Sequence, residues 1–300
     1  MSQYKVARTP ILEIAYYEHG APTGWPVVLS HGFPYDVHAY DKVVPLLTSQ
    51  GARVIVPYLR GHGPTRFLSS STIRSGQQAA LGSDLVSLLN SLDIEKAILA
   101  GFDWGGVASC VVTALWPERV AGLVSYAGYD IIDREAQQEP VNPTLESVVW
   151  YQHLFQSERG RKCLARDRKK LCKLLWTQWS PAWPFTDEVF DCTAESFENE
   201  DFVDVVICVY RHCLGNEAGD PELEDLERRL AAKPKIIVPC ITLDGTQDPL
   251  KPGGSAGHAE MFEARHERRE VDAGHALPFE APEAFAKAIL DLHQWVSGSK

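Results

Sequence analysis

The alternation of short apolar runs with amphipathic stretches constrains this chain more than any other feature. Apolar runs of the kind found in strands buried on both faces alternate with segments of helical periodicity up to residue 126. Because parallel strands are joined by long crossover connections, usually helices, this order predicts a mostly parallel, doubly wound α/β sheet with helices on both faces. The expected strands are 26–30, 53–57, 96–100 and 120–126, and a helix is expected over 73–91.

The pattern changes between residues 130 and 219. Strand-like runs mostly disappear there, four tryptophans enter, and helices are expected over 144–157 and 199–213. The alternation then resumes with an expected helix at 221–232, strand at 235–243, helix at 256–264, strand at 268–271 and helix at 281–296. We therefore predict a core formed by residues 1–129 and 220–300. A helical cap, residues 130–219, is inserted after the fourth parallel strand.

Charge and cysteine usage narrow the classes of partner. The formal net charge of −11 argues against nucleic acid, because nucleic-acid-binding surfaces concentrate Lys and Arg. Seven widely spaced cysteines without a C-x-x-C pair suggest reduced thiols and a cytoplasmic location. No stretch approaches the roughly 18 apolar residues of a membrane span. We expect a monomer or homodimer that acts on a small molecule.

A glycine-rich turn follows the expected strand at 96–100. In the segment GFDWGG (101–106), glycines flank Asp103 with the spacing of a nucleophile elbow, a strained turn between a strand and a helix. Such a turn holds its central side chain above the carboxyl end of the sheet, where ligands bind in this architecture. The alternative is that Asp103 only caps the following helix, a common role of Asp.

Three further segments complete a set that can support nucleophilic catalysis. HGFP (31–34) directly follows the first buried strand. Asp248 follows the expected strand at 235–243, and His275 follows the last short strand. The order of nucleophile, acid and histidine along the chain is the one that accompanies a nucleophile elbow.

Together these segments resemble the α/β-hydrolases of the epoxide hydrolase and haloalkane dehalogenase group, in which Asp replaces the nucleophilic Ser. The resemblance covers essentially the whole chain and also includes RGHG (60–63). It implies the α/β-hydrolase fold, with Asp103 as nucleophile, His275 as base and Asp248 as the acid that orients it. It further implies that the backbone N–H groups of Phe33 and Trp104 form the oxyanion hole.

Three other aspartates compete with Asp248 for the role of the acid. Asp244 ends its strand too early, and Asp272 is too close in sequence to His275 to reach its far ring nitrogen easily. Asp130 follows the fourth strand, where some relatives of this fold place their acid.

Two tyrosines of the cap extend the resemblance. The segments WYQHLFQ (150–156) and VYR (209–211) are similar to those that carry the ring-opening tyrosines of epoxide hydrolases, which implies this role for Tyr151 and Tyr210. Either tyrosine could instead be a packed helix residue. The implied substrate pocket is formed by His31, Phe33, Trp104, Trp150, Tyr151 and Tyr210.

An aspartate nucleophile indicates the class of reaction. A serine attacking a saturated carbon would form an ether, which water does not readily cleave, whereas a carboxylate forms an ester that can be hydrolysed. The aspartate therefore favours displacement at a saturated carbon. With the tyrosines, the resemblance implies that an apolar or aromatic epoxide is opened to a vicinal diol through an Asp103 ester, which water activated by His275 then hydrolyses. The scheme uses no metal and no cofactor.

A haloalkane or haloacid dehalogenase is the alternative, because it shares the Asp103 and His275 chemistry. The Trp104 indole could bind a halide. However, haloalkane dehalogenases commonly carry Asn where this chain has Phe33, and fluoroacetate-type enzymes carry Arg where it has Trp104. A receptor on a hydrolase scaffold is a third class, but such receptors usually have a damaged triad, and this triad is intact.

Overall fold

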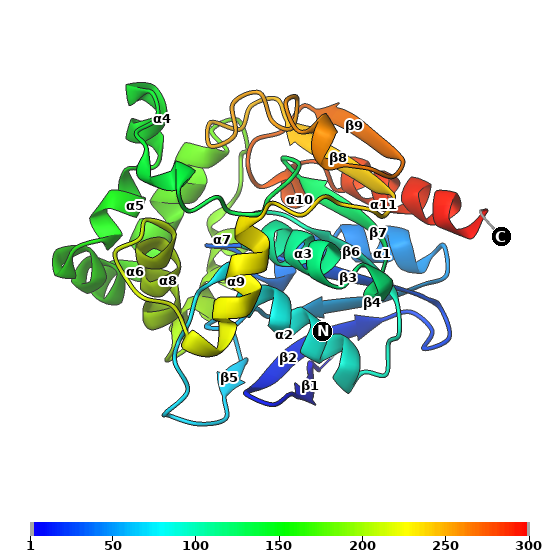
Figure 1. Cartoon of the computed structure of the whole chain (residues 1–300), viewed down its shortest axis with the longest axis horizontal. Helices are drawn as coiled ribbons and strands as arrows, with labels where there is room; N and C mark the ends of the chain where they lie inside the picture. The colour runs from blue at the N-terminus through cyan, green and yellow to red at the C-terminus, as the bar shows by residue number, and fades with distance from the viewer. Residues whose placement is uncertain (1–2, 299–300) are drawn as a thin grey trace.

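The structure, a computed structural model, describes residues 3–298. Within this range the strands form one nine-stranded sheet of order β1-β2-β4-β3-β6-β7-β8-β9, with β5 paired to β2 (Figure 1). The strands are β1 (Lys5–Arg8), β2 (Leu12–His19), β3 (Trp25–Ser30), β4 (Ala52–Pro57), β5 (Arg66–Phe67), β6 (Ala97–Gly101), β7 (Val120–Tyr126), β8 (Cys240–Gly245) and β9 (His266–Val271).

The sheet is parallel from β4 to β9 and antiparallel at its other edge. Every neighbouring pair from β4–β3 to β8–β9 is parallel, whereas β2 pairs antiparallel with β1, β4 and β5. The predicted α/β class with a mostly parallel sheet is therefore confirmed. Because parallel strands end at the same edge, the loops after β3, β6, β7, β8 and β9 meet there.

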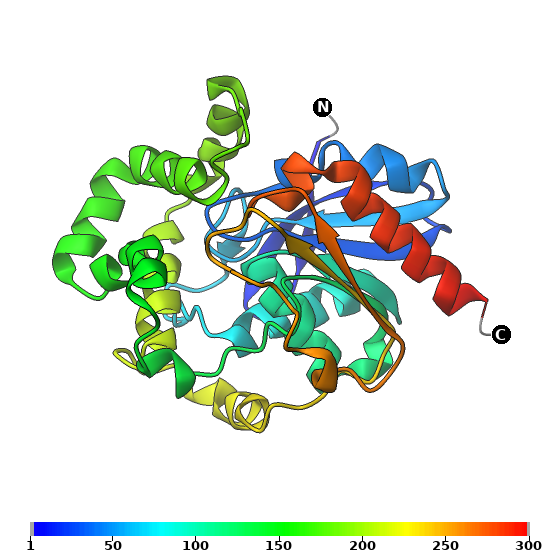
Figure 2. The ribbon, with the colours of Figure 1, turned by 90° about the horizontal axis from the view of Figure 1, so that it is seen from above.

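Helices cover both faces of the sheet. Helices α2 (Gln78–Ser91), α3 (Trp104–Leu115) and α9 (Glu224–Ala231) pack against one another. Helices α1 (Val43–Thr48) and α11 (Pro282–Ser297) pack together, with the short α10 (Leu277–Glu280) before α11. Figure 2 shows these two groups on opposite sides of the strands.

Several expected elements differ from the structure, among them the helix expected at 144–157, which is divided into α4 (Pro143–Val148) and α5 (Trp150–Phe155). The helix expected from residue 73 begins at Gln78, because the Ser75 carbonyl accepts from Arg60 Nη1 and the Gly76 N–H donates to Cys208 Sγ. The strand expected at 235–243 begins at Cys240, directly after a proline without an N–H. The helix expected at 256–264 is wrong, since only the turn Ala259–Met261 is helical there.

A helical insertion separates β7 from β8. It contains α4 (Pro143–Val148), α5 (Trp150–Phe155), α6 (Glu158–Trp179), α7 (Asp187–Ala194) and α8 (Phe202–Cys213). Figures 1 and 2 show these helices, in green and yellow-green, gathered at one side of the sheet. We propose that residues 130–219 form the cap and that residues 1–129 and 220–300 form the core.

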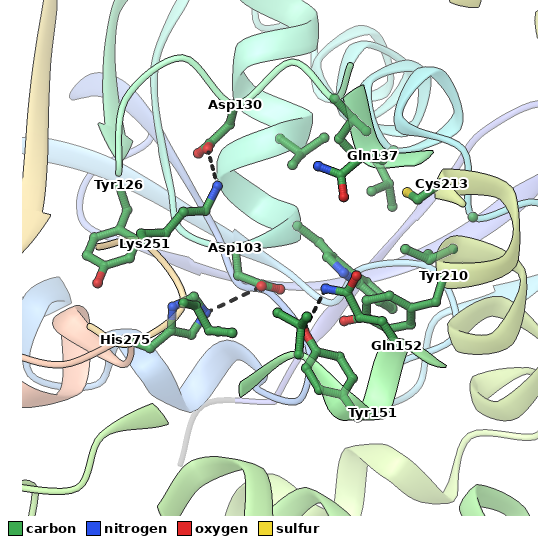
Figure 3. Close-up of a pocket in the computed structure, with 18 of the residues that line it drawn as sticks. Asp103, Tyr126, Asp130, Gln137, Tyr151, Gln152, Tyr210, Cys213, Lys251 and His275 are labelled. Atoms are coloured by element: carbon green, nitrogen blue, oxygen red, sulfur yellow. Dashed lines mark hydrogen bonds and ion pairs between the residues drawn. The ribbon is translucent and has the colours of Figure 1, made fainter. Parts of the chain in front are cut away.

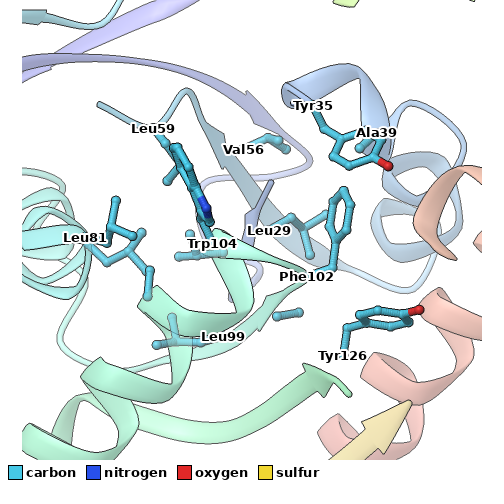
Figure 4. Close-up of a cluster of buried hydrophobic side chains, with 14 of the residues drawn as sticks. Leu29, Tyr35, Ala39, Val56, Leu59, Leu81, Leu99, Phe102, Trp104 and Tyr126 are labelled. Carbon is cyan, nitrogen blue, oxygen red and sulfur yellow. The ribbon is translucent and has the colours of Figure 1, made fainter. Parts of the chain in front are cut away.

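The residues on either side of Asp103 pack into the main hydrophobic core. Leu29 of β3 and Leu99 of β6 are fully buried, and Phe102 and Trp104 lie with them in one cluster (Figure 4). The turn that carries Asp103 is therefore anchored by side chains before and after it.

No helix within residues 3–298 has both the length and the apolar character needed to cross a membrane.

Candidate active site

Asp103 lies in a strained turn between β6 and α3. Its backbone has φ 52° and ψ −129°, a conformation that residues other than glycine rarely adopt. The neighbouring glycines make the turn possible: a Cβ on Gly105 would lie 1.9 Å from the Ser30 carbonyl oxygen, and one on Gly101 would lie 2.4 Å from the Gly105 carbonyl oxygen. The turn therefore has the geometry that the sequence pattern predicts.

The loop after β3 lies directly against the Asp103 side chain. A Cβ on Gly32 would be 2.3 Å from Asp103 Oδ1, so only glycine allows this approach. The Phe33 N–H donates to Asp103 Oδ1 at 2.7 Å. Trp104 is the first residue of α3, and its N–H is among those that a helix leaves without an intrahelical partner. Both backbone groups expected in the oxyanion hole thus adjoin Asp103.

His275 lies between two carboxylates. Its Nδ1 is 2.9 Å from Asp248 Oδ2. Its Nε2 is 3.4 Å from Asp103 Oδ2, a contact that Figure 3 shows. Asp248 is in the loop after β8, and His275 is in the loop between β9 and α10. The structure therefore brings the three residues of the predicted triad together.

The end of α6 in the cap holds the backbone of the histidine loop. The His275 N–H donates to the Trp179 carbonyl at 3.1 Å, and the Ala276 N–H donates to Ser180 Oγ at 3.0 Å. The Ser180 hydroxyl in turn donates to Glu280 of α10 at 2.6 Å. The position of the imidazole thus depends on contacts with the cap as well as with the core.

Asp248 is fixed by two further donors. Its Oδ2 accepts from the Tyr126 hydroxyl at 2.7 Å, and its Oδ1 accepts from the Leu250 N–H at 2.8 Å. Burial favours the neutral acid, but the interaction with His275 and these hydrogen bonds outweigh it and hold the pKa of Asp248 below its usual value.

The three competing aspartates bond to other partners. The Asp130 carboxylate pairs with Lys251, at 3.3 Å from its Nζ. Asp244 accepts from Ser255 and Arg268, and Asp272 accepts from the side-chain amide of Gln247. These partners leave Asp248 as the carboxylate that contacts His275 Nδ1.

Two opposing effects determine the pKa of His275. Burial favours the neutral imidazole, but the Asp248 and Asp103 carboxylates favour the imidazolium more strongly and raise the pKa of His275 to about 10. We therefore describe the resting site as an imidazolium between two carboxylates.

Both cap tyrosines face the cavity that contains Asp103 and His275. This cavity has a volume of about 260 Å³, and Tyr151 of α5 and Tyr210 of α8 are part of its wall. Their rings lie 5.2 Å apart between centroids and are almost perpendicular, at 89°. Gln152 Nε2 donates to the Tyr151 hydroxyl oxygen at 3.2 Å (Figure 3). Burial raises the pKa of both tyrosines, so their hydroxyls remain hydrogen-bond donors.

The expected pocket residues divide into two groups. Trp104, Tyr151 and Tyr210 line the cavity. The wall formed by the described residues does not include His31, Phe33 or Trp150. The Phe33 ring stacks on Trp104 at 5.2 Å, His31 is fully buried, and the Trp150 indole donates to Gln178 at 2.9 Å. The Phe33 ring therefore packs behind Trp104, which lines the cavity, whereas His31 and Trp150 lie outside the cavity wall.

Several residues of the wall were not assigned there from the sequence. Lys251, Gln137, Gln152 and Tyr126 carry polar groups to the cavity or its edge, and Asp130 joins them as the partner of Lys251. Of these residues, the sequence pattern indicates a role only for Asp130, as an alternative acid. Within residues 3–298 no three His, Cys, Asp or Glu side chains are arranged as a metal site.

Comparisons with known proteins agree with this geometry. The family described as alpha/beta hydrolase fold matches residues 26–156. A crystal structure of a Klebsiella pneumoniae protein, provisionally assigned as an epoxide hydrolase, is 41% identical, with 97% of each chain covered and a TM-score of 0.96. The chain belongs to the α/β-hydrolase fold family, among its epoxide hydrolase-like members. The resemblance inferred from the sequence is thereby confirmed.

Curated relatives match a shorter part of the chain. Epoxide hydrolase 3 from Siraitia grosvenorii is 33% identical over 133 residues, which are 44% of this chain and 39% of that protein. A haloalkane dehalogenase from Psychrobacter cryohalolentis is 34% identical over 114 residues, which are 38% of this chain and 37% of that protein. The matched segments thus span about two fifths of these relatives.

Proposed function

We propose that this protein hydrolyses an epoxide to a vicinal diol through a covalent ester on Asp103. The observation that carries this proposal is the pair of tyrosine hydroxyls, Tyr151 and Tyr210, in the same cavity as Asp103 and His275. The similarity to proteins named epoxide hydrolases supports it. A nucleophile beside two hydroxyl donors suits an epoxide, because the oxygen released from the attacked carbon remains bonded to the rest of the substrate and can accept from both hydroxyls.

The first step opens the ring. An Asp103 carboxylate oxygen attacks one epoxide carbon, the bond between that carbon and the epoxide oxygen breaks, and an ester forms. Negative charge develops on the released oxygen. Tyr151 and Tyr210 donate hydrogen bonds to it, and one of them transfers its proton, so that the oxygen becomes a hydroxyl.

The second step needs a neutral imidazole, and the first step provides it. Ester formation removes the charge of Asp103, one of the two carboxylates that raise the pKa of His275. The imidazolium then releases its proton more easily, and this proton can restore the tyrosine.

Neutral His275 takes a proton from water, which attacks the Asp103 ester carbonyl. The oxyanion is stabilised by the backbone N–H groups of Phe33 and Trp104. Collapse breaks the bond between the Asp103 acyl carbon and the substrate oxygen, and the departing alkoxide takes the remaining proton of the added water. The diol is released, the Asp103 carboxylate is regenerated, and His275 returns to the imidazolium.

The surroundings support a substrate that is mainly apolar, either aliphatic or aromatic. Most wall residues of the cavity are apolar, and they include Leu81, Val107, Leu145, Val149 and Val209. Within the same proposal the protein acts in the cytoplasm, in keeping with its seven free cysteines, as a monomer or homodimer.

Trapping of the ester tests the proposal. His275→Gln should still form the ester but not hydrolyse it, because attack by a carboxylate needs no base. Intact-protein mass spectrometry after incubation with an epoxide that the wild type consumes should show an adduct with the mass of the whole substrate. Peptide mapping should place this adduct on Asp103, and the His275→Gln/Asp103→Ala double variant should lack it.

The matched control is His293→Gln, on the outer helix α11, which should turn over normally. An inactive His275→Gln without adduct would refute the covalent scheme. Haloalkanes tested in parallel distinguish the dehalogenase alternative: the adduct would then have the mass of the substrate minus hydrogen halide, with halide released.

A further inference from the structure

Lys251 places a cationic group in the wall of an otherwise mostly apolar cavity. Its ammonium is 3.3 Å from Asp130 Oδ1, and no other described residue accepts a hydrogen bond from it. Its side chain is 49% exposed, whereas that of Asp130 is 5% exposed. An ammonium carries three N–H donors, so this single bond leaves two donors for a ligand.

Gln137 adds a second polar group to the same wall. Its side-chain amide lines the cavity and has no hydrogen-bond partner among residues 3–298. Figure 3 shows Lys251 on the side of Asp103 away from Tyr151 and Tyr210, whereas Gln137 is drawn on the same side of the view as Gln152 and Tyr210. A substrate whose epoxide oxygen faces the tyrosines would therefore extend its substituent toward Lys251, and Gln137 is a further polar group of the same wall.

The charges around the cavity determine what kind of polar group fits. The carboxylates of Asp103, Asp130 and Asp248 face the cations Lys251 and His275, which leaves one formal negative charge. A carboxylate on the substrate would add to this excess and be repelled. An uncharged oxygen can accept from the free donors without that cost.

We propose that Lys251 and Gln137 select epoxides whose apolar chain carries an uncharged oxygen acceptor, such as a ketone or ether. The inference rests on the proposed function, because it assigns the substrate class of the same cavity. Lys251 binds the acceptor oxygen, and Asp130 holds the ammonium in place as its positioning partner.

Three epoxides of equal chain length test this assignment. One ends in an alkyl group, one carries a ketone near the far end, and one carries a carboxylate there. For the wild type, kcat/KM for the ketone should exceed that for the alkyl epoxide by about tenfold, since a net hydrogen bond to a charged donor is worth at least that much. The carboxylate should be the poorer of the two polar substrates.

The variants remove the donors without changing the net charge. Lys251→Met/Asp130→Asn should reduce the ketone-to-alkyl ratio to about one, and Lys251→Arg should retain much of it. Gln137→Leu should lower the ratio partly, whereas its neighbour Gln138→Leu, outside the cavity wall, should leave it unchanged. Because both substrates are measured on one sample, the ratio does not depend on how much of a variant folds.

Each other outcome overturns the inference. A wild-type ratio near one, or a ratio that survives Lys251→Met/Asp130→Asn, would refute the role of Lys251. A carboxylate substrate better than the ketone would refute the preference for an uncharged acceptor. If the alkyl epoxide is hydrolysed in these cases, the proposed function stands. If none of the three epoxides is opened, both the proposed function and the role of Lys251 are refuted.

Discussion

Replacement of Asp36 by a residue that cannot ionise should change how the free energy of unfolding depends on pH. The size of this change can be worked out from the surroundings of the Asp36 carboxyl group. Asp36 lies in the loop after β3 and is 1% exposed. Its carboxylate accepts hydrogen bonds from Thr193 at 3.0 Å and Ser196 at 2.6 Å, both in the cap, and from the His38 N–H at 3.0 Å. This buried carboxyl group therefore joins core and cap.

The size of the effect follows from the pKa of this carboxyl. Burial, only partly offset by His38 and the hydroxyl donors, raises the pKa of Asp36 from 3.8 to about 6. The folded protein then binds the proton more tightly than the unfolded chain. The associated stability is fully present below about pH 4 and is lost as the pH rises through about 6. A shift of about two units corresponds to about 3 kcal/mol.

Urea unfolding followed by tryptophan fluorescence measures this effect. Asp36→Asn keeps the shape of the side chain but cannot ionise, so the free energy of unfolding of the wild type minus that of the variant should fall by about 3 kcal/mol between about pH 4 and about pH 7. Asp191→Asn, at an exposed position of α7, is the control and should show no such trend. A difference for Asp36→Asn that is constant over this range would refute the reasoning.

Four further substitutions probe the reaction itself. Tyr151→Phe and Tyr210→Phe should each slow ring opening by about 10- to 100-fold in single-turnover kinetics, less than the loss of a sole donor, because the other hydroxyl remains. Full rates in both variants and in the double variant would exclude the tyrosines from this role. Asp248→Asn should accumulate ester during turnover, seen by mass spectrometry, because the imidazole loses its orienting carboxylate; hydrolysis at the wild-type rate would contradict this. Gly32→Ala should abolish activity while circular dichroism stays native, since the new Cβ would meet Asp103 at 2.3 Å; a fully active variant would contradict the close approach.

The parallel strands and the site loops could be predicted because their signals are local. The strand expected at 120–126 matches β7, and the expected turn at 101–106 contains the positive φ of Asp103. Each depends on a few consecutive residues: a short apolar run, or glycines at fixed offsets from one side chain.

Features that depend on tertiary contacts could not be predicted in this way. Strand β2 mixes buried and half-buried residues, with Glu18 and His19 at its end, and so lacks the continuous apolar run of a central strand. The helix expected over 256–264 lies in the connection between β8 and β9, where only Ala259–Met261 is helical. Gly253 and Gly254, just before it, have positive φ, which is not a helical conformation. Lys251 and Gln137 are far apart in the sequence, and only the folded structure places both in the wall of one cavity.

The hydrogen bonds from the histidine loop to the end of α6 limit how modular this architecture is. Cap exchange between relatives is an attractive route to new specificities, but a graft that replaces residues 179 and 180 would also replace the carbonyl that accepts from the His275 N–H. It would remove the Ser180 hydroxyl as well, which is one of the two acceptors of the Ala276 N–H. The segment from α4 to α5 carries no comparable bond to that loop among the described residues. Chimaeras should therefore join inside the insertion, and the recipient should keep the carboxyl-terminal end of its own α6.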